Sequence, residues 1–147
     1  MYRNSSPTPT ILFVDNDWDQ IKLIKETAKH LDGVFVTIQK GGESALEYLT
    51  QNDNDVDAIV LDLAMPFMSG LELTRLLRIK QFKEEVYPPF EIFWATGYTI
   101  DLSNDYNPVT QDYYAYGVRK MFTKPYDVAD IVAEIKTVFE TRKSNDF

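Results

Sequence analysis

Short apolar runs alternate along the chain with segments in which apolar residues recur every three or four positions. Short continuous apolar runs are typical of strands buried on both faces, and the wider spacing is typical of helices that pack on a sheet. The runs predict strands at residues 11–14, 34–39, 57–62, 90–96 and 119–123. The periodic segments predict helices at residues 17–31, 45–52, 71–82, 109–116 and 127–143.

This alternation predicts an α/β fold, because parallel strands are joined by right-handed and usually helical crossovers. We expect a doubly wound five-stranded parallel sheet with strand order 2-1-3-4-5 and helices on both faces. A chain of 147 residues suits one such domain. We assign it to residues 10–142, with a flexible N-terminal lead at 1–9 and a C-terminal tail at 143–147.

Reactive or charged side chains stand at the carboxyl ends of four predicted strands. Asp15 follows the first strand and Asp62 ends the third; Thr96 ends the fourth and Lys124 follows the fifth. In sheets of this kind, ligands bind beyond the carboxyl ends of the strands, where the strand order reverses. Each residue alone has an ordinary explanation as a helix cap, a turn residue or a surface charge. Their coincidence at one edge favours a functional site.

The acidic residues at this edge predict a cation site. Two like charges roughly 4 Å apart repel by about 4 kcal/mol at an effective dielectric near 20, so clustered carboxylates need a raised pKa or a cation. The chain has no Cys and one His, and an oxygen-only ligand set favours Mg²⁺. A carboxylate beside Mg²⁺ that faces a hydroxyl and an ammonium can accept a phosphoryl group. Asp62 is then the nucleophile, with Thr96 and Lys124 as phosphate contacts.

Composition narrows the partners and the location. The net charge of −8 and the absence of a Lys/Arg cluster argue against direct binding of nucleic acid. No apolar run approaches the length of a membrane span, and residues 1–9 lack the features of a signal peptide. We therefore expect a cytoplasmic protein with no membrane partner.

These motifs together resemble the receiver domain of two-component response regulators. The stretch "DLAMPFMSG", which begins at Asp62, fits that family's Asp-x-x-Met-Pro-x-Met-x-Gly loop at every defined position. "FVDND" is similar to the acidic pair after the family's first strand, "FWATG" to its strand-four Thr or Ser followed by a small residue, and "FTKP" to its strand-five Lys-Pro. The resemblance extends over about residues 10–142.

The resemblance implies a flavodoxin-like fold and a Mg²⁺-dependent transfer of a phosphoryl group to Asp62 from a histidine kinase or a phosphotransfer protein. Such a protein is a phosphoacceptor signalling domain, which catalyses only its own phosphorylation and dephosphorylation and signals by altered partner binding. The resemblance also implies a cis Lys124–Pro125 peptide bond. The residues implied for the site are the phosphoacceptor Asp62, the contacts Thr96 and Lys124, and the metal ligands Asp15, Asn16, Asp62 and the carbonyl of Ala64.

Three features depart from the family pattern. Asn16 stands where a carboxylate usually binds Mg²⁺, so we expect weaker metal binding, through the amide oxygen and with Asp17 as a possible substitute. Met121 stands three residues before Lys124, where an aromatic switch residue is common. The segment from Tyr98 to Tyr116 is long and rich in tyrosine. Such a segment either packs as a loose loop or forms an aromatic surface for a downstream protein.

Two other functions remain open from the sequence. A pseudo-receiver, which keeps the fold for protein binding without phosphorylation, is suggested by Asn16. A haloacid-dehalogenase-like phosphatase would use Asp15 of "DND" as its nucleophile. That reading is disfavoured because Asp19 stands where the phosphatase family expects Thr or Val, and because "KPYDVAD" supplies no adjacent acidic pair.

Overall fold

The structure is a computed structural model that describes residues 8–52, 56–82 and 90–144 of the chain. Within these ranges, five strands alternate with five helices. The strands are β1 (Thr10–Val14), β2 (Phe35–Gln39), β3 (Ala58–Asp62), β4 (Glu91–Thr96) and β5 (Val118–Thr123). The helices are α1 (Trp18–Ala28), α2 (Gly42–Asn52), α3 (Gly70–Phe82), α4 (Pro108–Ala115) and α5 (Val128–Ser144).

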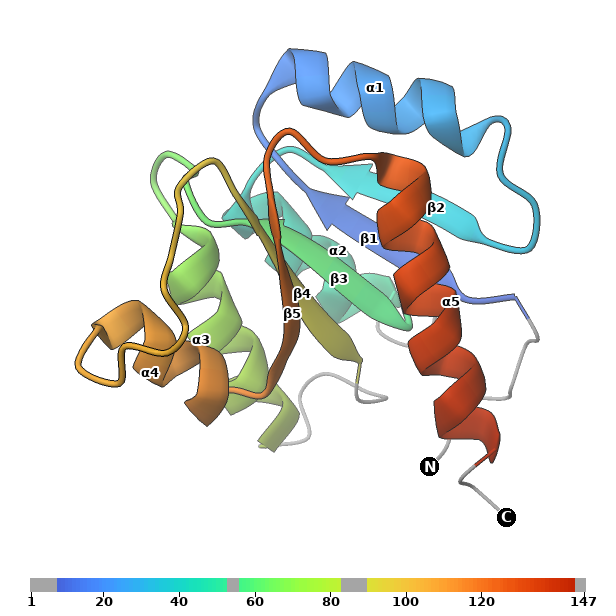
Figure 1. Cartoon of the computed structure of the whole chain (residues 1–147). Coiled ribbons are helices and arrows are strands. Elements are labelled where there is room, and N and C mark those ends of the chain that lie inside the picture. Colours follow the sequence, from blue (N-terminus) through green and yellow to red (C-terminus); the bar gives the residue numbers. More distant parts are fainter. Residues whose placement is uncertain (1–7, 53–55, 83–89, 145–147) are drawn as a thin grey trace.

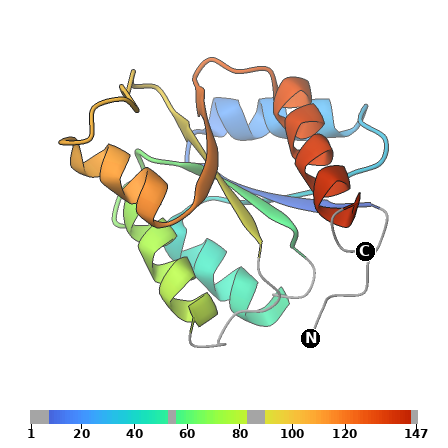
Figure 2. The same cartoon turned by 60° about the horizontal axis from the view of Figure 1, so that its bottom comes forward.

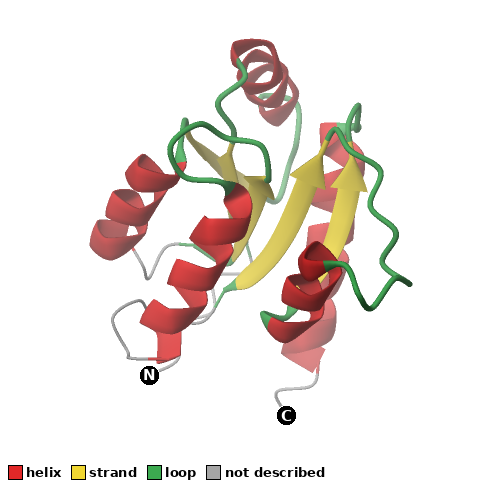
Figure 3. Cartoon of the chain, turned by 90° about the vertical axis from the view of Figure 1, so that its left-hand side faces the viewer, coloured by secondary structure: helices red, strands yellow, loops and turns green. Residues whose placement is uncertain are grey.

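The strands form one parallel sheet in the order β2-β1-β3-β4-β5, as the sequence predicts. Figure 3 shows the strands pointing the same way, so that their carboxyl ends meet at one edge. The order reverses at β1, because the chain passes from β1 outward to β2 and then back across β1 to β3. The site is therefore expected beyond the ends of β1 and β3.

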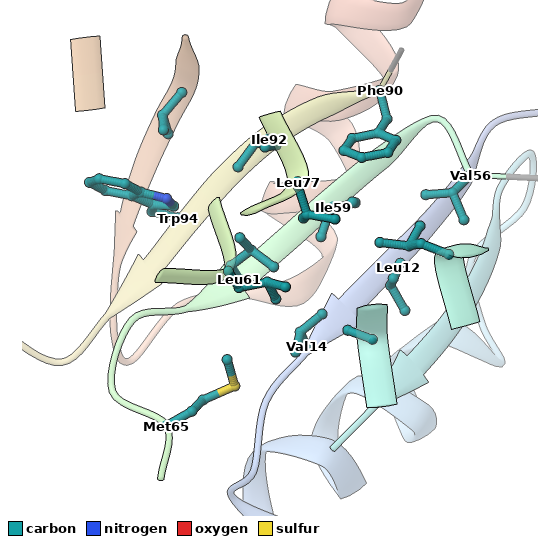
Figure 4. Close-up of a cluster of buried hydrophobic side chains, with 14 of the residues drawn as sticks. Leu12, Val14, Val56, Ile59, Leu61, Met65, Leu77, Phe90, Ile92 and Trp94 are labelled. Atoms are coloured by element: carbon teal, nitrogen blue, oxygen red, sulfur yellow. The ribbon is translucent and has the colours of Figure 1, made fainter. Parts of the chain in front are cut away.

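Two apolar layers cover the sheet, because successive side chains of a strand point to opposite faces. Ile11 and Phe13 pack with α1 and α5 on one face, whereas Leu12 and Val14 pack with α2 and α3 on the other. Figures 1 and 2 show α1 and α5 on one side of the sheet and α2, α3 and α4 on the other. Figure 4 shows the second layer, in which Trp94 is the largest fully buried side chain. The central strand β3 is buried throughout, which explains its continuous apolar sequence.

Several element boundaries differ from the predictions. Helix α1 ends at Ala28 rather than near residue 31, and the chain then turns through Gly33 with φ of +74°. Helix α2 begins at Gly42 rather than at residue 45; Gly42 is buried against Met68, a contact that the local sequence does not reveal.

The ends of the chain differ in a similar way from the assigned lead and tail. Pro9 is buried, and its carbonyl accepts a hydrogen bond from the amide of Phe35 at 2.9 Å. Helix α5 extends to Ser144, so residues 143 and 144 of the predicted tail are helical. Residues 1–7 of the predicted lead and residues 145–147 of the predicted tail lie outside the described residues. None of the described helices is long and apolar enough to cross a membrane.

Candidate functional site

Two buried carboxylates lie at the edge where the strand order reverses. Asp15 follows β1 and is 2% exposed, and Asp62 is the last residue of β3 and is 5% exposed. In each carboxyl group, one oxygen accepts a hydrogen bond from the backbone amide of the residue two positions further along the chain. Asp15 Oδ1 accepts from the amide of Asp17 at 2.9 Å, and Asp62 Oδ1 accepts from the amide of Ala64 at 3.1 Å. These bonds fix both carboxyl groups and leave the second oxygen of each for other contacts.

Lys124 joins the two carboxylates. Its Nζ lies 2.9 Å from Asp15 Oδ2 and 3.3 Å from Asp62 Oδ2. The lysine follows β5, and its amide donates to the carbonyl of Thr96 at 2.7 Å, which holds it beside the end of β4. The Lys124–Pro125 peptide bond is cis, in agreement with the prediction. Three strands thus bring together three residues that are far apart in sequence.

The electrostatics of this group favour a further positive charge. Burial raises the pKa of the Asp62 carboxyl above its ordinary value and the charge of Asp15 adds to this, against the opposing effects of the Ala64 amide and Lys124. Burial by itself would lower the pKa of the Lys124 ammonium, but its contacts with Asp15 and Asp62 outweigh this and raise it. One ammonium therefore balances only one of the two carboxylate charges, and a cation at the same edge would relieve the remaining repulsion between Asp15 and Asp62.

Thr96 lies at the end of β4, beside the strand that carries Asp62. It is fully buried, and its hydroxyl oxygen accepts a hydrogen bond from the amide of Tyr98 at 3.0 Å. The neighbouring carbonyl, that of Ala95, accepts from the amide of Leu63 at 3.1 Å, so the loops after β3 and β4 are tied together. Because the bond from Tyr98 uses a lone pair, the hydroxyl proton of Thr96 is left to be donated.

The other predicted metal ligands lie on exposed loops. Asn16 and Ala64 are both exposed, directly after Asp15 and two residues after Asp62, respectively. Asp17 is the N-cap of α1, where its Oδ1 accepts from the amide of Asp19 at 3.0 Å.

The donor set fits Mg²⁺ in kind, although it is small. Within the described residues, no three His, Cys, Asp or Glu side chains are grouped so that they could hold a metal ion. Asp15 and Asp62 supply two carboxylates, and the remaining predicted donors are the amide of Asn16 and the carbonyl of Ala64. Mg²⁺ in proteins is commonly held by one or two carboxylates, with water and substrate phosphate completing its octahedron.

The loop after Asp62 is held by one buried and one closely packed residue. Met65 is buried in the apolar layer. Gly70 begins α3 against the backbone of Asp62, so near that a Cβ at this position would lie 2.3 Å from the Asp62 carbonyl oxygen. Between them, Phe67 is fully exposed and has φ of +67°, a conformation that is strained for a bulky side chain. Phe67 cannot be recognised from the sequence, since no local pattern marks its conformation.

Comparison with known proteins decides the family. A family model described as the response regulator receiver domain matches residues 11–136, most of the chain. The chain belongs to this receiver family. The heme response regulator HssR of Staphylococcus saprophyticus is 31% identical to the receiver over 138 residues, which cover 92% of this chain and 54% of that protein. The transcriptional regulatory protein CpxR of Escherichia coli K12 is 27% identical over 142 residues, with coverage of 92% and 54%. The receiver spans about half the length of these curated relatives.

Solved structures agree with this fold. A CheY-like receiver domain protein from Methanospirillum hungatei superimposes with a TM-score of 0.72 at 20% identity, covering 94% of this chain and 98% of that one. A receiver domain protein from Clostridium thermocellum gives a TM-score of 0.70 at 24% identity, covering 92% and 97%. The receiver therefore has the flavodoxin-like fold that the sequence predicts.

Two further side chains at this edge of the sheet, Tyr126 and Lys40, were missed in the sequence. Burial, and the charges of Asp15 and Asp62, raise the pKa of the Tyr126 hydroxyl, which places this tyrosine in the field of the site. At the start of α1, Lys40 Nζ lies 3.9 Å from the centre of the Trp18 ring. Tyr126 follows the recognised Lys-Pro pair directly, so its position was the available signal.

The segment between β4 and β5 combines exposed and buried tyrosines. Tyr98, Tyr106 and Tyr114 are exposed, whereas Tyr113 is buried against Trp94 with ring centres 5.6 Å apart. Helix α4 begins after Asn107, whose side chain caps it by accepting from the amide of Val109 at 2.9 Å. The segment thus packs through Tyr113 and exposes Tyr98, Tyr106 and Tyr114, whereas Tyr116 is half-buried.

Proposed function

We propose that this receiver accepts a phosphoryl group on Asp62 from the phosphohistidine of a histidine kinase or phosphotransfer protein, in a Mg²⁺-dependent reaction. The observation that carries this proposal is the buried contact of one ammonium, that of Lys124, with the carboxylates of both Asp15 and Asp62. An ion pair with a purely structural role needs only one carboxylate. A carboxylate nucleophile that receives a dianionic group needs a positive charge held beside it, and Lys124 supplies that charge next to Asp62.

The chain's own residues divide the work. Asp62 Oδ1 is held by the Ala64 amide, so the carboxylate is oriented before the donor arrives. In the transfer, a carboxylate oxygen bonds to phosphorus as the bond from phosphorus to the donor's imidazole nitrogen breaks. Lys124 offsets the charge of the phosphoryl oxygens, and the Thr96 hydroxyl donates a hydrogen bond to one of them.

A bound Mg²⁺ would supply further neutralisation of the phosphoryl oxygens. Asp15, Asp62, the Asn16 amide oxygen and the Ala64 carbonyl would hold it. With an amide in place of one carboxylate, the affinity for the cation is expected to be lower than in a site with three acids.

The output of the receiver would be a change in partner binding. The curated relatives include proteins named as transcriptional regulators, but the net charge of −8 argues against direct contact of this chain with nucleic acid. We propose that a downstream protein binds at the segment from Tyr98 to Tyr116, in which three tyrosines are exposed. A cytoplasmic location and the absence of a membrane partner complete the proposal.

Intact mass after incubation with a small acyl phosphate and Mg²⁺ tests the function. We expect one phosphoryl adduct on the unmodified sequence, labile to hydroxylamine as an acyl phosphate is, and none on Asp62→Asn. Asp15→Asn should slow the uptake without abolishing it, because Asp15 contributes charge and not the bond to phosphorus. An adduct lost only in Asp15→Asn would support the phosphatase, and no adduct on any protein would support the pseudo-receiver.

The Asn16→Asp substitution tests the metal site. An added carboxylate should tighten Mg²⁺ binding about tenfold, equivalent to about 1.4 kcal/mol, because its attraction to a divalent ion exceeds its repulsion by Asp15 and Asp62. Trp18 is two residues away and 66% exposed, so its emission should report the titration, whereas the fully buried Trp94 should change little. Trp18→Phe separates the two signals. An unchanged midpoint in Asn16→Asp would show that residue 16 is not a ligand.

A further inference from the structure

A buried polar bridge joins α3 to strand β4 of the sheet. The indole Nε1 of Trp94 in β4 donates to Thr74 Oγ1 at 2.9 Å, and the Thr74 hydroxyl donates to the carbonyl of Gly70 at 2.7 Å. Trp94 and Thr74 are both fully buried. Buried polar groups that lose a partner are costly, so the indole and the hydroxyl hold each other in place.

One end of this bridge lies on the loop that carries Asp62. The bridge ends at Gly70, the first residue of α3, whose amide donates to the carbonyl of Leu63 at 3.1 Å. The backbone of Gly70 also packs directly against the carbonyl of Asp62. A displacement of the loop after Asp62 therefore moves the carbonyl to which Thr74 is bonded.

The other end lies against α4. The Trp94 ring meets the edge of Tyr113 with their ring centres 5.6 Å apart and an interplanar angle of 68°. Tyr113 in turn contacts the exposed Tyr114 in the same manner, with their ring centres 5.1 Å apart. An ion pair between Arg75 and Asp112 ties the next residue of α3 to α4 as well.

The carboxyl end of α4 is also attached to α3. Arg78 Nε donates to the carbonyl of Tyr116 at 2.8 Å, and its Nη2 donates to that of Gly117 at 3.3 Å. Helix α3 thus contacts the Asp62 loop at its start and, through Arg75 and Arg78, reaches α4 and the residues that follow it.

Trp94 also lies beside Met121, which stands where an aromatic switch residue is common in the family. It pairs in register with Met121 of β5, and Met121 packs at the border of the same apolar layer. A methionine adapts its shape to its surroundings, whereas a hydrogen-bonded indole has one fixed orientation. The indole is therefore the better suited of the two to transmit a displacement.

We propose that Thr74 and Trp94 are positioning residues that hold the Asp62 loop and transmit its displacement to α4 and Tyr114. The proposal rests on the proposed function only for the nature of the displacing group, a phosphoryl group on Asp62. The path itself consists of the contacts from Gly70 through Thr74 and Trp94 to Tyr113.

The test compares Thr74→Val, which removes the hydroxyl and keeps the shape, with Thr74→Ser, which retains the hydroxyl. Amide hydrogen exchange of residues 108–115 is measured with and without an acyl phosphate, and intact mass reports modification of Asp62. We expect Thr74→Val to be modified as the unaltered protein is, while the phosphate-dependent change of exchange in α4 falls at least about fivefold. Thr74→Ser should restore the response. Trp94→Phe, which removes the indole N–H and also makes the ring smaller, should likewise lower the phosphate-dependent change in α4 and provides a second variant.

A purely structural role would give a different pattern. It would raise exchange in both states and preserve the difference between them, and that result in Thr74→Val would overturn the proposal. Thr137→Val is the matched control, because the Thr137 hydroxyl makes the same bond to a carbonyl four residues earlier in α5 but is exposed. This control should leave the response of α4 unchanged.

A second perturbation separates this proposal from the proposed function. Asp62→Asn removes the charge from the loop without any phosphoryl group, and it should alter exchange in α4 in the Thr74 background but not in Thr74→Val. This comparison remains decisive if no protein takes up a phosphoryl group, an outcome that would defeat only the proposed function. Equal effects of Asp62→Asn in both backgrounds would refute the path through Thr74.

Discussion

Replacing Lys124 with alanine is expected to lower the free energy of unfolding by about 3 kcal/mol at neutral pH, because it leaves two buried charges without their cation. Asp15 and Asp62 are 2% and 5% exposed, and Lys124 Nζ is within 3.3 Å of an oxygen of each. The protein should still fold, since the lysine lies at the edge of the sheet and not in either apolar layer. Urea unfolding of the two proteins measures the difference.

The loss in Lys124→Ala should depend on pH in a defined direction. Burial and Asp15 already hold the pKa of Asp62 above its ordinary 3.8, and Lys124 opposes this rise. Without the lysine the pKa rises further, so the folded state binds this proton more tightly than the unfolded chain does. Protonation then stabilises the fold below pH 3.8, and this stabilisation is lost as the pH rises through the elevated pKa. The variant should therefore be closest to the unaltered protein in acid.

Lys120→Ala is the matched control for this prediction. Lys120 Nζ lies 3.0 Å from Glu134 Oε1, but both side chains are about half exposed. Such a surface pair contributes about 0–1 kcal/mol, and its removal should show little dependence on pH between acid and neutral conditions. A cost for Lys124→Ala no greater than for Lys120→Ala, or one that is the same at both pH values, would contradict the electrostatic role assigned to Lys124.

The Lys124→Ala variant also separates phosphorylation of Asp62 from the conformational change that follows it. If Lys124 contacts the phosphoryl group, Lys124→Ala should still be modified on Asp62 but should lose the phosphate-dependent change of exchange between Tyr98 and Tyr116. A response equal to that of the unaltered protein would show that the lysine is only a structural counter-charge.

The fold and the core of the site follow from the sequence for a simple physical reason. Parallel strands place their carboxyl ends at one edge, so recognising β1, β3 and β5 is enough to bring Asp15, Asp62 and Lys124 together. Lys124 and Asp15 are 109 residues apart along the chain, yet their contact needs no information beyond strand order and strand ends.

Other features could not be derived because they depend on tertiary contacts. Asp17 is a good helix cap and a good metal ligand by residue type, and only the bond to Asp19 separates the two. Gly42 has no room for a side chain because Met68 occupies that space, and Met68 lies on a different loop. Thr74 fits the helical pattern of α3 by position alone, so its bond to Trp94 is visible only once α3 is packed on β4.

Gly70→Ala is expected to destabilise the receiver by about 2–3 kcal/mol, against the ordinary preference of helices for alanine. The added Cβ would lie 2.3 Å from the Asp62 carbonyl oxygen and 2.9 Å from both the Asp62 carbonyl carbon and Leu63 Cα. All three atoms belong to the backbone, so no side-chain rotation can relieve the contact. The start of α3 or the loop that carries Asp62 must move instead.

The matched control for Gly70→Ala is Gly41→Ala, where no atom lies within 4 Å of the added carbon and φ is not positive. There the substitution should change stability by less than about 1 kcal/mol, and it can stabilise by reducing the freedom of the unfolded chain.

Because the displaced loop holds Asp62 through the Ala64 amide, Gly70→Ala should also slow phosphoryl uptake, whereas Gly41→Ala should not. Unfolding in urea and the rate of adduct formation measure the two effects separately. Equal stability of the two variants would mean that α3 is free to move away from Asp62, and the contact on which the path through Thr74 depends would then be too loose to transmit a displacement.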